Sequence, residues 1–379
     1  MLSVYKNFSI KMNKKLIFMI GILLLLAVAG CQGGKKDQSP ISDVDIRKGT
    51  DGIIMEFLPN APPENVFEGD ESNPSEFPIS LRIKNAGATD IGGSIEKNKE
   101  TLEIEGGIIA LGFEKAYVGI VPAGEEKQEF GIKGKSIYNP FGDEDFITIE
   151  GEAKKIGVQS EKHPSTIFAT ACYPYSTTLG TSVCIDPEII PQEQGQQKAC
   201  QVRDLVFSEG QGGPVSVIKV ETRILPQADD KVKPHFLIHI KNAGNGQIVN
   251  ASNFDKACTS GGIDYKEFFN TVIVSASLSG MPLKCNGKEI LGDPTRVVVT
   301  LRKGSGFALA KSEDMIRCTL EEDLDGDGNP DDFNNDGKQD IEFINSGADA
   351  YVSSLKVELE YGYTFTISKN IIIEKILTH

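Results

Sequence analysis

A repeated strand-and-turn motif most constrains how this chain can fold. The pentapeptide Ile-Lys-Asn-Ala-Gly occurs at 83–87 and again at 240–244, an offset of 157 residues (240 − 83). In the residues that precede it, apolar side chains recur at every second position, in both copies. Alternation with a period of two predicts a strand with one buried face, and the Asn-Ala-Gly that follows predicts a turn. The chain is therefore expected to contain two copies of one β module.

A second anchor supports this duplication. Tyr-Pro-Tyr-Ser at 173–176 matches Tyr-Gly-Tyr-Thr at 361–364, an offset of 188 (361 − 173). The second copy therefore holds 31 extra residues between its two anchors (188 − 157). The tyrosines occupy the same alternate positions as the apolar residues of their strands. This predicts that all four lie in the core: Tyr173, Tyr175, Tyr361 and Tyr363.

The rest of the chain indicates an all-β protein. Short candidate strands are separated by clusters of Gly, Pro and Asn, a spacing typical of β-sandwiches. The strands are expected at 53–58, 77–84, 147–153, 165–176, 215–224, 234–241, 271–278, 296–301 and 355–367. Residues 187–199 are polar and rich in Gln, which suits a linker between the copies.

An Asn-Ala-Gly turn after such a strand resembles the immunoglobulin-like domains of prokaryotic surface proteins, including the cell-adhesion-related family. The two-copy layout with Tyr-x-Tyr is similar to lipid-anchored surface proteins of archaea. The resemblance implies two tandem Ig-like β-sandwich domains, at 49–186 and 200–379, the second with an Asp-rich insertion at 321–342. It also implies a non-catalytic extracellular module, and it transfers no catalytic residue.

The N-terminus reads as an export signal. Residues 16–29 are almost all apolar and follow two lysines, and the run is too short to span a bilayer comfortably. It ends in Val-Ala-Gly-Cys, which resembles the lipobox of secreted lipoproteins. We therefore expect a signal peptide at 1–30, lipidation of Cys31 and a lipid-anchored tether at 31–48, on the extracellular face of the membrane. An ordinary signal peptide or an uncleaved anchor is the alternative.

The charge of the chain argues against nucleic acid as a partner. The formal net charge is −15, and residues 1–30 carry four lysines and no acid, so a chain cut after residue 30 has about −19 (−15 − 4). Nucleic-acid binders depend on Lys and Arg contacts to phosphate. The same excess argues against attraction to an anionic membrane through a basic patch.

Six cysteines remain after Cys31, and an even number behind an export signal predicts three disulfides. Spacing alone leaves 15 pairings open. A turn expected between Cys172 and Cys184 favours that pair. The other pairings expected are Cys285–Cys318 and Cys200–Cys258. Zinc ligation is disfavoured because the sequence has no C-x-x-C spacing.

The insertion carries the one sharp chemical motif, D-x-D-x-D-G-x-x-D at 323–331, followed by a second loop, D-x-N-x-D-G-x-x-D, at 332–340. Residues 321–342 hold ten acids and one Lys. Carboxylates at loop positions 1, 3 and 5 converge on Ca²⁺ when Gly at position 6 permits the turn. Position 12 is not Glu in either loop, so the segment resembles thrombospondin type 3 repeats or dockerins more than an EF-hand. The expected ligands of a structural Ca²⁺ are Asp323, Asp325, Asp327, Asn329, Asp331, Asp332, Asn334, Asp336 and Asp340.

Motifs for catalysis are weak, and we expect no enzyme. Lys-Gly-Lys-Ser at 133–136 resembles the end of a phosphate-binding loop, but Glu129 stands where that motif needs Gly. Ile-Tyr-Asn-Pro follows where a helix should begin. There is no G-x-S-x-G and no H-E-x-x-H.

The favoured function is a non-catalytic surface lipoprotein for adhesion, envelope structure or binding of a surface protein or glycan. A substrate-binding lipoprotein of a transporter is the alternative, but it requires α/β lobes whose alternation is not visible in the sequence. A secreted hydrolase on a β scaffold is a third possibility.

Overall fold

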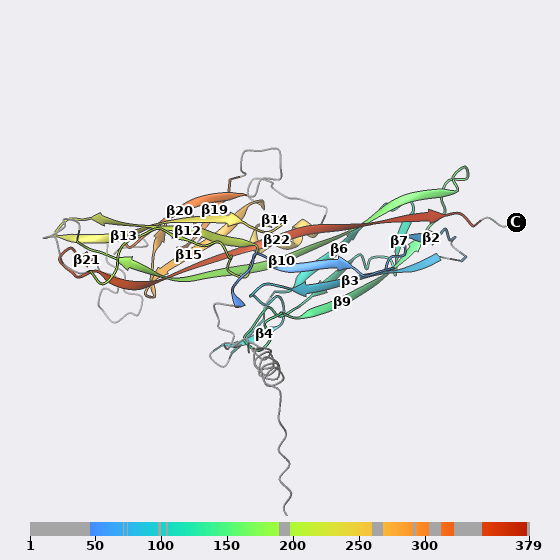
Figure 1. Ribbon diagram of the computed structural model, residues 1–379. Coiled ribbons are helices and arrows are strands. Elements are labelled where there is room, and N and C mark those ends of the chain that lie inside the picture. Colours follow the sequence, from blue (N-terminus) through green and yellow to red (C-terminus); the bar gives the residue numbers. More distant parts are fainter. Residues whose placement is uncertain are drawn as a thin grey trace, which may run out of the picture. The chain divides into compact units, whose positions relative to one another are not determined.

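The computed structural model of the protein describes residues 46–70, 72–73, 75–97, 100–103, 105–188, 198–259, 268–290, 293–302, 312–321 and 343–376. These residues form β-strands and one short 3₁₀ helix, η1 (Ala251–Cys258), so the expected all-β class is confirmed (Figure 1). Among them, no helix is long and apolar enough to cross a membrane. All belong to one compact unit, Ser42–His379.

Two smaller sheets contain the predicted repeat strands. The first has the order β1-β3-β9-β7 and consists of β1 (Ile53–Phe57), β3 (Ser75–Asn85), β9 (Glu144–Ala153) and β7 (Val118–Val121). The second has the order β11-β12-β13-β20-β17, with β21 beside β13. It consists of β11 (Leu205–Val206), β12 (Val215–Pro226), β13 (Lys231–Asn242), β20 (Glu313–Thr319), β17 (Lys284–Cys285) and β21 (Ile344–Asn345). The pairing within both sheets is antiparallel.

A third, ten-stranded sheet joins the two halves of the chain. Its main order is β18-β19-β15-β22-β10-β6-β8. These strands are β18 (Lys288–Ile290), β19 (Asp293–Thr300), β15 (Thr271–Leu278), β22 (Tyr351–Glu374), β10 (Lys162–Ile185), β6 (Gly107–Gly112) and β8 (Lys127–Phe130). Three short strands add to it: β14 (Gln247–Val249), β16 (Met281–Pro282) and β2 (Asn65–Phe67). A separate hairpin pairs β4 (Ser94–Lys97) with β5 (Glu100–Glu103).

All nine predicted strands are present, and two are much longer than predicted. β10 and β22 each run for 24 residues, which is about 80 Å at ~3.3 Å per residue. They pair antiparallel over their whole length, from Lys162↔Glu374 to Ile185↔Tyr351 (green and red in Figure 1). The sequence predicted that the first of them ends at 176. It continues because Thr177, Leu179, Val183 and Ile185 stay buried, so the face of the strand that meets the core extends to Ile185.

The duplication is visible as a local two-fold relation between the long strands. Pro174 pairs with Gly362, and these two positions are themselves equivalent by the repeat offset (362 − 174 = 188). An axis through this rung therefore exchanges the two copies. The flanking strands follow the same relation, because the rung Ile53↔Asn85 recurs as Val215↔Asn242. Strands β1-β3-β9-β7 thus correspond to β12-β13-β20-β17.

The two copies share one hydrophobic core as well as one sheet. Buried residues of the small sheets and of the ten-stranded sheet form a single cluster, which gives the molecule its sandwich-like layers. The segment 187–199, expected as a linker, separates the copies along the chain. The sheet itself does not divide there, since β10 of the first copy pairs with β22 of the second.

The disulfide pattern differs from the predicted one in two of three pairs. Cys285–Cys318 forms as predicted. The other bonds are Cys172–Cys258 and Cys184–Cys200, so the predicted Cys172–Cys184 and Cys200–Cys258 pairings are wrong. The reason is that the expected turn between 172 and 184 does not exist. Both cysteines lie in β10, 12 residues apart (184 − 172), which separates them by about 40 Å.

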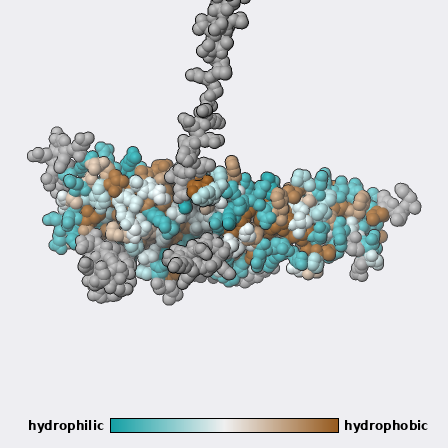
Figure 2. Space-filling view, turned by 90° about the horizontal axis from the view of Figure 1, so that it is seen from below, coloured by the Kyte–Doolittle hydropathy of each residue, from teal (hydrophilic) through white to brown (hydrophobic). Residues whose placement is uncertain are grey.

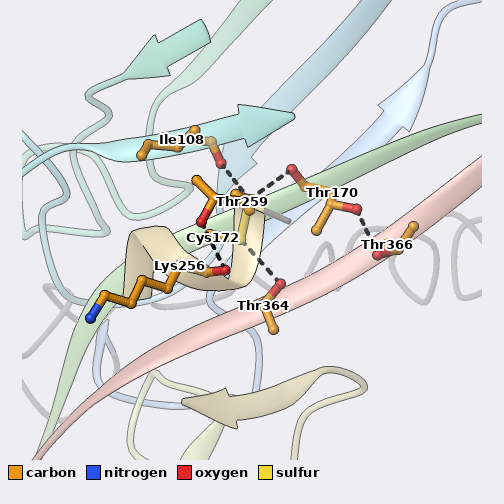
Figure 3. The surroundings of a disulfide bond; sticks show 8 residues. Ile108, Thr170, Cys172, Lys256, Thr259, Thr364 and Thr366 are labelled. Carbon is orange, nitrogen blue, oxygen red and sulfur yellow. Dashed lines mark hydrogen bonds between the residues drawn. A yellow bond between two sulfur atoms is a disulfide. The ribbon is translucent and has the colours of Figure 1, made fainter. Parts of the chain in front are cut away.

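The bond Cys172–Cys258 connects the two copies. It joins β10 to η1, which lies against β10 and β22 (Figure 3). Around it is a second, smaller core that includes Phe254, Val249 and Phe268. The sheet therefore buries apolar side chains on both faces at this point, which explains why Cys172 is fully buried although it points away from the main core.

Candidate binding surface

The two repeated motifs of the sequence meet each other in space, once in each copy. The Ile53 N–H donates to the Tyr173 hydroxyl (3.1 Å), and the Val215 N–H donates to the Tyr361 hydroxyl (3.2 Å). Positions 53 and 215 are equivalent by their place in the ladders, as are 173 and 361 by the repeat offset. Matching hydrogen bonds in both copies indicate that the motif was kept as a unit when the module was duplicated.

The second tyrosine of each pair binds the Asn-Ala-Gly turn. The hydroxyl of Tyr175 accepts from the Thr89 N–H (3.3 Å) and donates to the carbonyl of Gly212 (3.0 Å). In the other copy, the hydroxyl of Tyr363 accepts from the Gly246 N–H (2.7 Å) and donates to Asn242 Oδ1 (3.2 Å).

The four tyrosines form one buried cluster at the centre of the β10–β22 pair. Neighbouring ring centroids lie 5.9 to 6.3 Å apart. The prediction that they belong to the core is confirmed. Burial raises the pKa of Tyr363 to about 12, and it raises the pKa of each of the other three as well. Because all four rings are buried, the cluster is part of the packed core.

The glycine of each Asn-Ala-Gly turn is required by this contact. A Cβ on Gly87 would collide with the Tyr175 hydroxyl and would lie 2.7 Å from the Gly212 carbonyl oxygen. A Cβ on Gly244 would collide with the Tyr363 hydroxyl.

We expect Gly87→Ala and Gly244→Ala each to lower the free energy of unfolding by about 1–3 kcal/mol, the usual cost of overpacking a rigid core. Chemical unfolding followed by circular dichroism measures it. Gly180→Ala is the matched control, because a Cβ there has no atom within 4 Å. Equal stability of the Gly87 and Gly180 variants would contradict this account of the repeat.

The loop between β8 and β9 is the most exposed apolar segment that the structure describes. The loop is held at its base by hydrogen bonds to the first Asn-Ala-Gly turn. The Lys135 N–H donates to the Gly87 carbonyl (2.7 Å), and the Gly134 N–H donates to Asp90 Oδ1 (2.7 Å). The Asp143 N–H donates to the Lys133 carbonyl (3.1 Å), which closes the loop.

The tip of this loop is also fixed by its own polar groups. The Ser136 N–H donates to the Asn139 carbonyl (2.9 Å), and the Asn139 N–H donates to Ser136 Oγ (3.0 Å). The Asn139 side-chain amide donates to Asp143 Oδ1 (2.5 Å). Gly142 has a φ of +72°, a conformation that favours glycine. The side chains on the tip are therefore presented by a defined backbone.

Three of these side chains are apolar and point into solvent. Tyr138 is 93% exposed, Phe141 74% and Ile137 50%. We call Ile137, Tyr138 and Phe141 the aromatic tip. Figure 2 shows, on one face of the molecule, how apolar residues (brown) stand among mostly polar ones (teal). Single exposed apolar residues are normal on protein surfaces, but several gathered on one fixed loop indicate a binding surface.

A hollow of about 830 Å³ borders the aromatic tip. Phe141 and several glycines line it, and its charged residues are of both signs with one acid in excess: Lys84 and Lys133 against Asp143, Glu144 and Asp145. Glu144 also approaches Arg82, which pairs with Glu56 (2.8 Å). An open hollow that presents charges of both signs suits a polar or zwitterionic group beside an apolar contact rather than a strongly charged ligand.

Sequence reasoning did not single out the aromatic tip. The motif Lys-Gly-Lys-Ser at 133–136 was considered as part of a phosphate-binding loop, and the Ile-Tyr-Asn-Pro after it argued against a helix. The structure places this motif at the base of the loop, and no helix follows it. The sequence feature that could have revealed the tip is the presence of Ile, Tyr and Phe between Gly134 and Gly142, in a stretch with neither helical nor strand periodicity.

The predicted calcium ligands and the predicted lipidation site, Cys31, lie outside the described residues. Within the described part of the chain, no group of three or more His, Cys, Asp or Glu is arranged to hold a metal ion.

Neither the protein-family models nor the curated proteins compared with this sequence give a match.

Proposed function

We propose that the protein is a non-catalytic lipoprotein on the extracellular face of the cell membrane, where it serves adhesion or envelope structure by binding a surface protein or a glycan. The observation that carries the proposal is that all six cysteines after Cys31 pair into three disulfides. Disulfides persist in oxidising compartments and are rare in the cytosol. An exported chain agrees with the signal-like N-terminus, and lipidation of Cys31 holds it at the membrane.

The scaffold also suits a load-bearing or binding role. Two copies of a sandwich module are joined by 24 consecutive rungs and by a disulfide between the copies. We propose that each copy is an Ig-like sandwich, since each pairs a small antiparallel sheet with strands of the large one. The transporter alternative requires two α/β lobes, whereas the strands that the structure describes pair antiparallel except for β2 with β22, and one isolated bridge, Gly49 with Gly210, is also parallel.

The first test addresses the three disulfides on which the extracellular location depends. Intact cells that express the protein are treated with a membrane-impermeant thiol reagent and a surface protease, and the protein is then analysed by mass spectrometry. We expect no free thiol among the six cysteines, cleavage by the external protease and a lipid on Cys31. Six reduced cysteines in a protease-resistant protein would refute an extracellular location.

The binding role needs a partner, and a surface pull-down with the whole lipidated protein, with and without calcium, identifies it. Recovery of one protein or glycan by the parent protein, and not by a control lipoprotein, supports binding. Recovery of nothing favours a structural role in the envelope.

We further propose that the Asp-rich insertion binds Ca²⁺ as a structural ion. Carboxylates at the D-x-D-x-D spacing support it, and so does the density of acids, which repel one another without a cation. The insertion is expected to stabilise the protein only when the ion is bound, since ligand binding to the folded state raises its stability.

Calcium is expected to raise the melting temperature of the parent protein relative to chelator, and the double variant Asp325→Ala/Asp327→Ala is expected to lose this increase. Thermal unfolding followed by circular dichroism measures both. Identical melting of the parent protein with calcium and with chelator would end the calcium proposal.

A further inference from the structure

We propose that the aromatic tip inserts into the interface of the membrane that carries the lipid anchor, so that the protein contacts its own membrane through Ile137, Tyr138 and Phe141. This inference rests on the proposed lipidation of Cys31. It goes beyond that proposal because it assigns a second, non-covalent membrane contact and thereby fixes which side of the protein faces the lipid.

The position of the loop is the first argument. The base of the loop touches the segment that leads back to Cys31: Lys135 Nζ donates to the carbonyl of Lys48 (3.4 Å). That segment is fixed at this point, because Ile46 is buried and the Gly49 N–H donates to the Glu209 carbonyl (2.7 Å). The aromatic tip therefore lies beside the place where the chain enters the fold.

The reach of the tether is the second argument. Ile46 lies fifteen positions after Cys31 in the sequence (46 − 31). Whatever its conformation, a chain of this length spans at most about 50 Å. The point where the chain enters the fold is thus held within about 50 Å of the lipidated residue, and so is a loop that touches it.

The chemistry of the tip is the third argument. The tyrosine ring suits the membrane interface, because its body is apolar and its hydroxyl can stay in water, and phenylalanine adds apolar surface to bury. Residues 136–142 contain no charged side chain. Insertion of such a loop depends on burial of apolar surface and needs no anionic lipid, so the net negative charge of the protein does not oppose it. The fixed backbone of the tip means that little ordering entropy is lost on contact.

The protein offers a matched control for this idea. Val158 is 92% exposed, as open as Tyr138. Its carbonyl accepts from Lys375 Nζ (3.1 Å), which places it at the end of the β10–β22 pair. That end is 12 rungs from the central Pro174↔Gly362 rung (374 − 362), or about 40 Å. A side chain there is equally apolar and exposed, but it is remote from the point of attachment.

The experiment uses the absence of tryptophan from the sequence. Single variants Tyr138→Trp, Phe141→Trp and Val158→Trp are prepared as full-length lipidated protein and reconstituted into neutral phosphatidylcholine vesicles, with and without brominated acyl chains. For Tyr138→Trp and Phe141→Trp we expect emission at shorter wavelength on the vesicles, quenching by the brominated lipid and loss of quenching by aqueous iodide. For Val158→Trp we expect none of these changes.

The outcomes separate this inference from the proposed lipid anchor. If the protein floats with the vesicles but the tryptophans at 138 and 141 stay open to iodide, the anchor holds and the membrane contact is refuted. The aromatic tip would then be expected to bind a partner protein at the cell surface instead. If the protein does not float, the anchor fails, and the same spectra at high lipid concentration decide whether the tip binds lipid without it. Equal quenching of the Val158→Trp variant would also refute a specific contact.

Discussion

Replacement of Tyr361 by alanine is expected to lower the free energy of unfolding by about 3–5 kcal/mol, the range for truncation of a large buried aromatic side chain. Tyr361 is fully buried, and its ring lies 6.0 Å from that of Tyr175 and 6.3 Å from that of Tyr363. Its removal opens a cavity at the centre of the β10–β22 pair. It also leaves the Val215 N–H without its acceptor, and Thr177 Oγ1 loses a partner at 2.7 Å.

Because of the two-fold relation, the same prediction can be tested at the equivalent tyrosine of the first copy. Tyr173 occupies the equivalent place in the first copy and accepts from the Ile53 N–H. Tyr173→Ala should therefore destabilise by a similar amount. The Tyr→Phe variants keep the ring and lose only the hydroxyl, so they should cost about 1–3 kcal/mol for the unsatisfied backbone donor.

Urea unfolding monitored by circular dichroism measures the series, with Tyr138→Ala as the control. That tyrosine is exposed, and its removal should leave stability within about 0.5 kcal/mol. The account of the cluster would be refuted if Tyr361→Ala were as mild as Tyr138→Ala. It would also be refuted if the Tyr→Phe variants were as severe as the Tyr→Ala variants.

Removal of the bond Cys172–Cys258 by the double variant Cys172→Ala/Cys258→Ala is expected to cost about 4–5 kcal/mol. The bond closes a loop with a sequence separation of 86, and in the chain-entropy model longer loops restrict the unfolded state more. The bond also fixes η1 to β10, so its loss loosens the smaller core around Phe254. Both effects act in the same direction.

The other two disulfides supply the comparison. Cys285–Cys318 has a separation of 33 and Cys184–Cys200 one of 16, for which the same model gives about 3.7 and 3.1 kcal/mol. Double alanine variants of each pair, measured by denaturant unfolding, should rank in that order. If removal of Cys172–Cys258 proved the mildest of the three, loop closure would not explain the role of this bond.

The disulfide map itself can be checked by direct chemical analysis. A non-reducing peptide digest of the parent protein should yield one linked pair for each bond. The three pairs differ from the predicted set by an exchange of partners between Cys172–Cys184 and Cys200–Cys258. The exchange shows where sequence reasoning fails, because the choice of partner depends on whether the chain turns between 172 and 184.

Local patterns were a reliable guide wherever one face of a strand is buried. The nine predicted strands exist because alternation with a period of two places every apolar side chain of a segment on the same side. Strands without clear alternation were missed, for instance β7, in which Val118, Gly119 and Ile120 are all buried. The 3₁₀ helix η1 was also missed, since its residues carry no helical periodicity strong enough to stand out.

The sequence by itself determined the β class, the duplication and the burial of the four tyrosines. Each of these depends on local periodicity or on a repeat, and both are written along the chain. Only the tertiary structure decided that β10 and β22 pair along their full length, that Cys172 bonds to Cys258, and that the aromatic tip is exposed. These features depend on which distant segments meet, and contacts between residues far apart in the chain leave no local pattern from which they can be read.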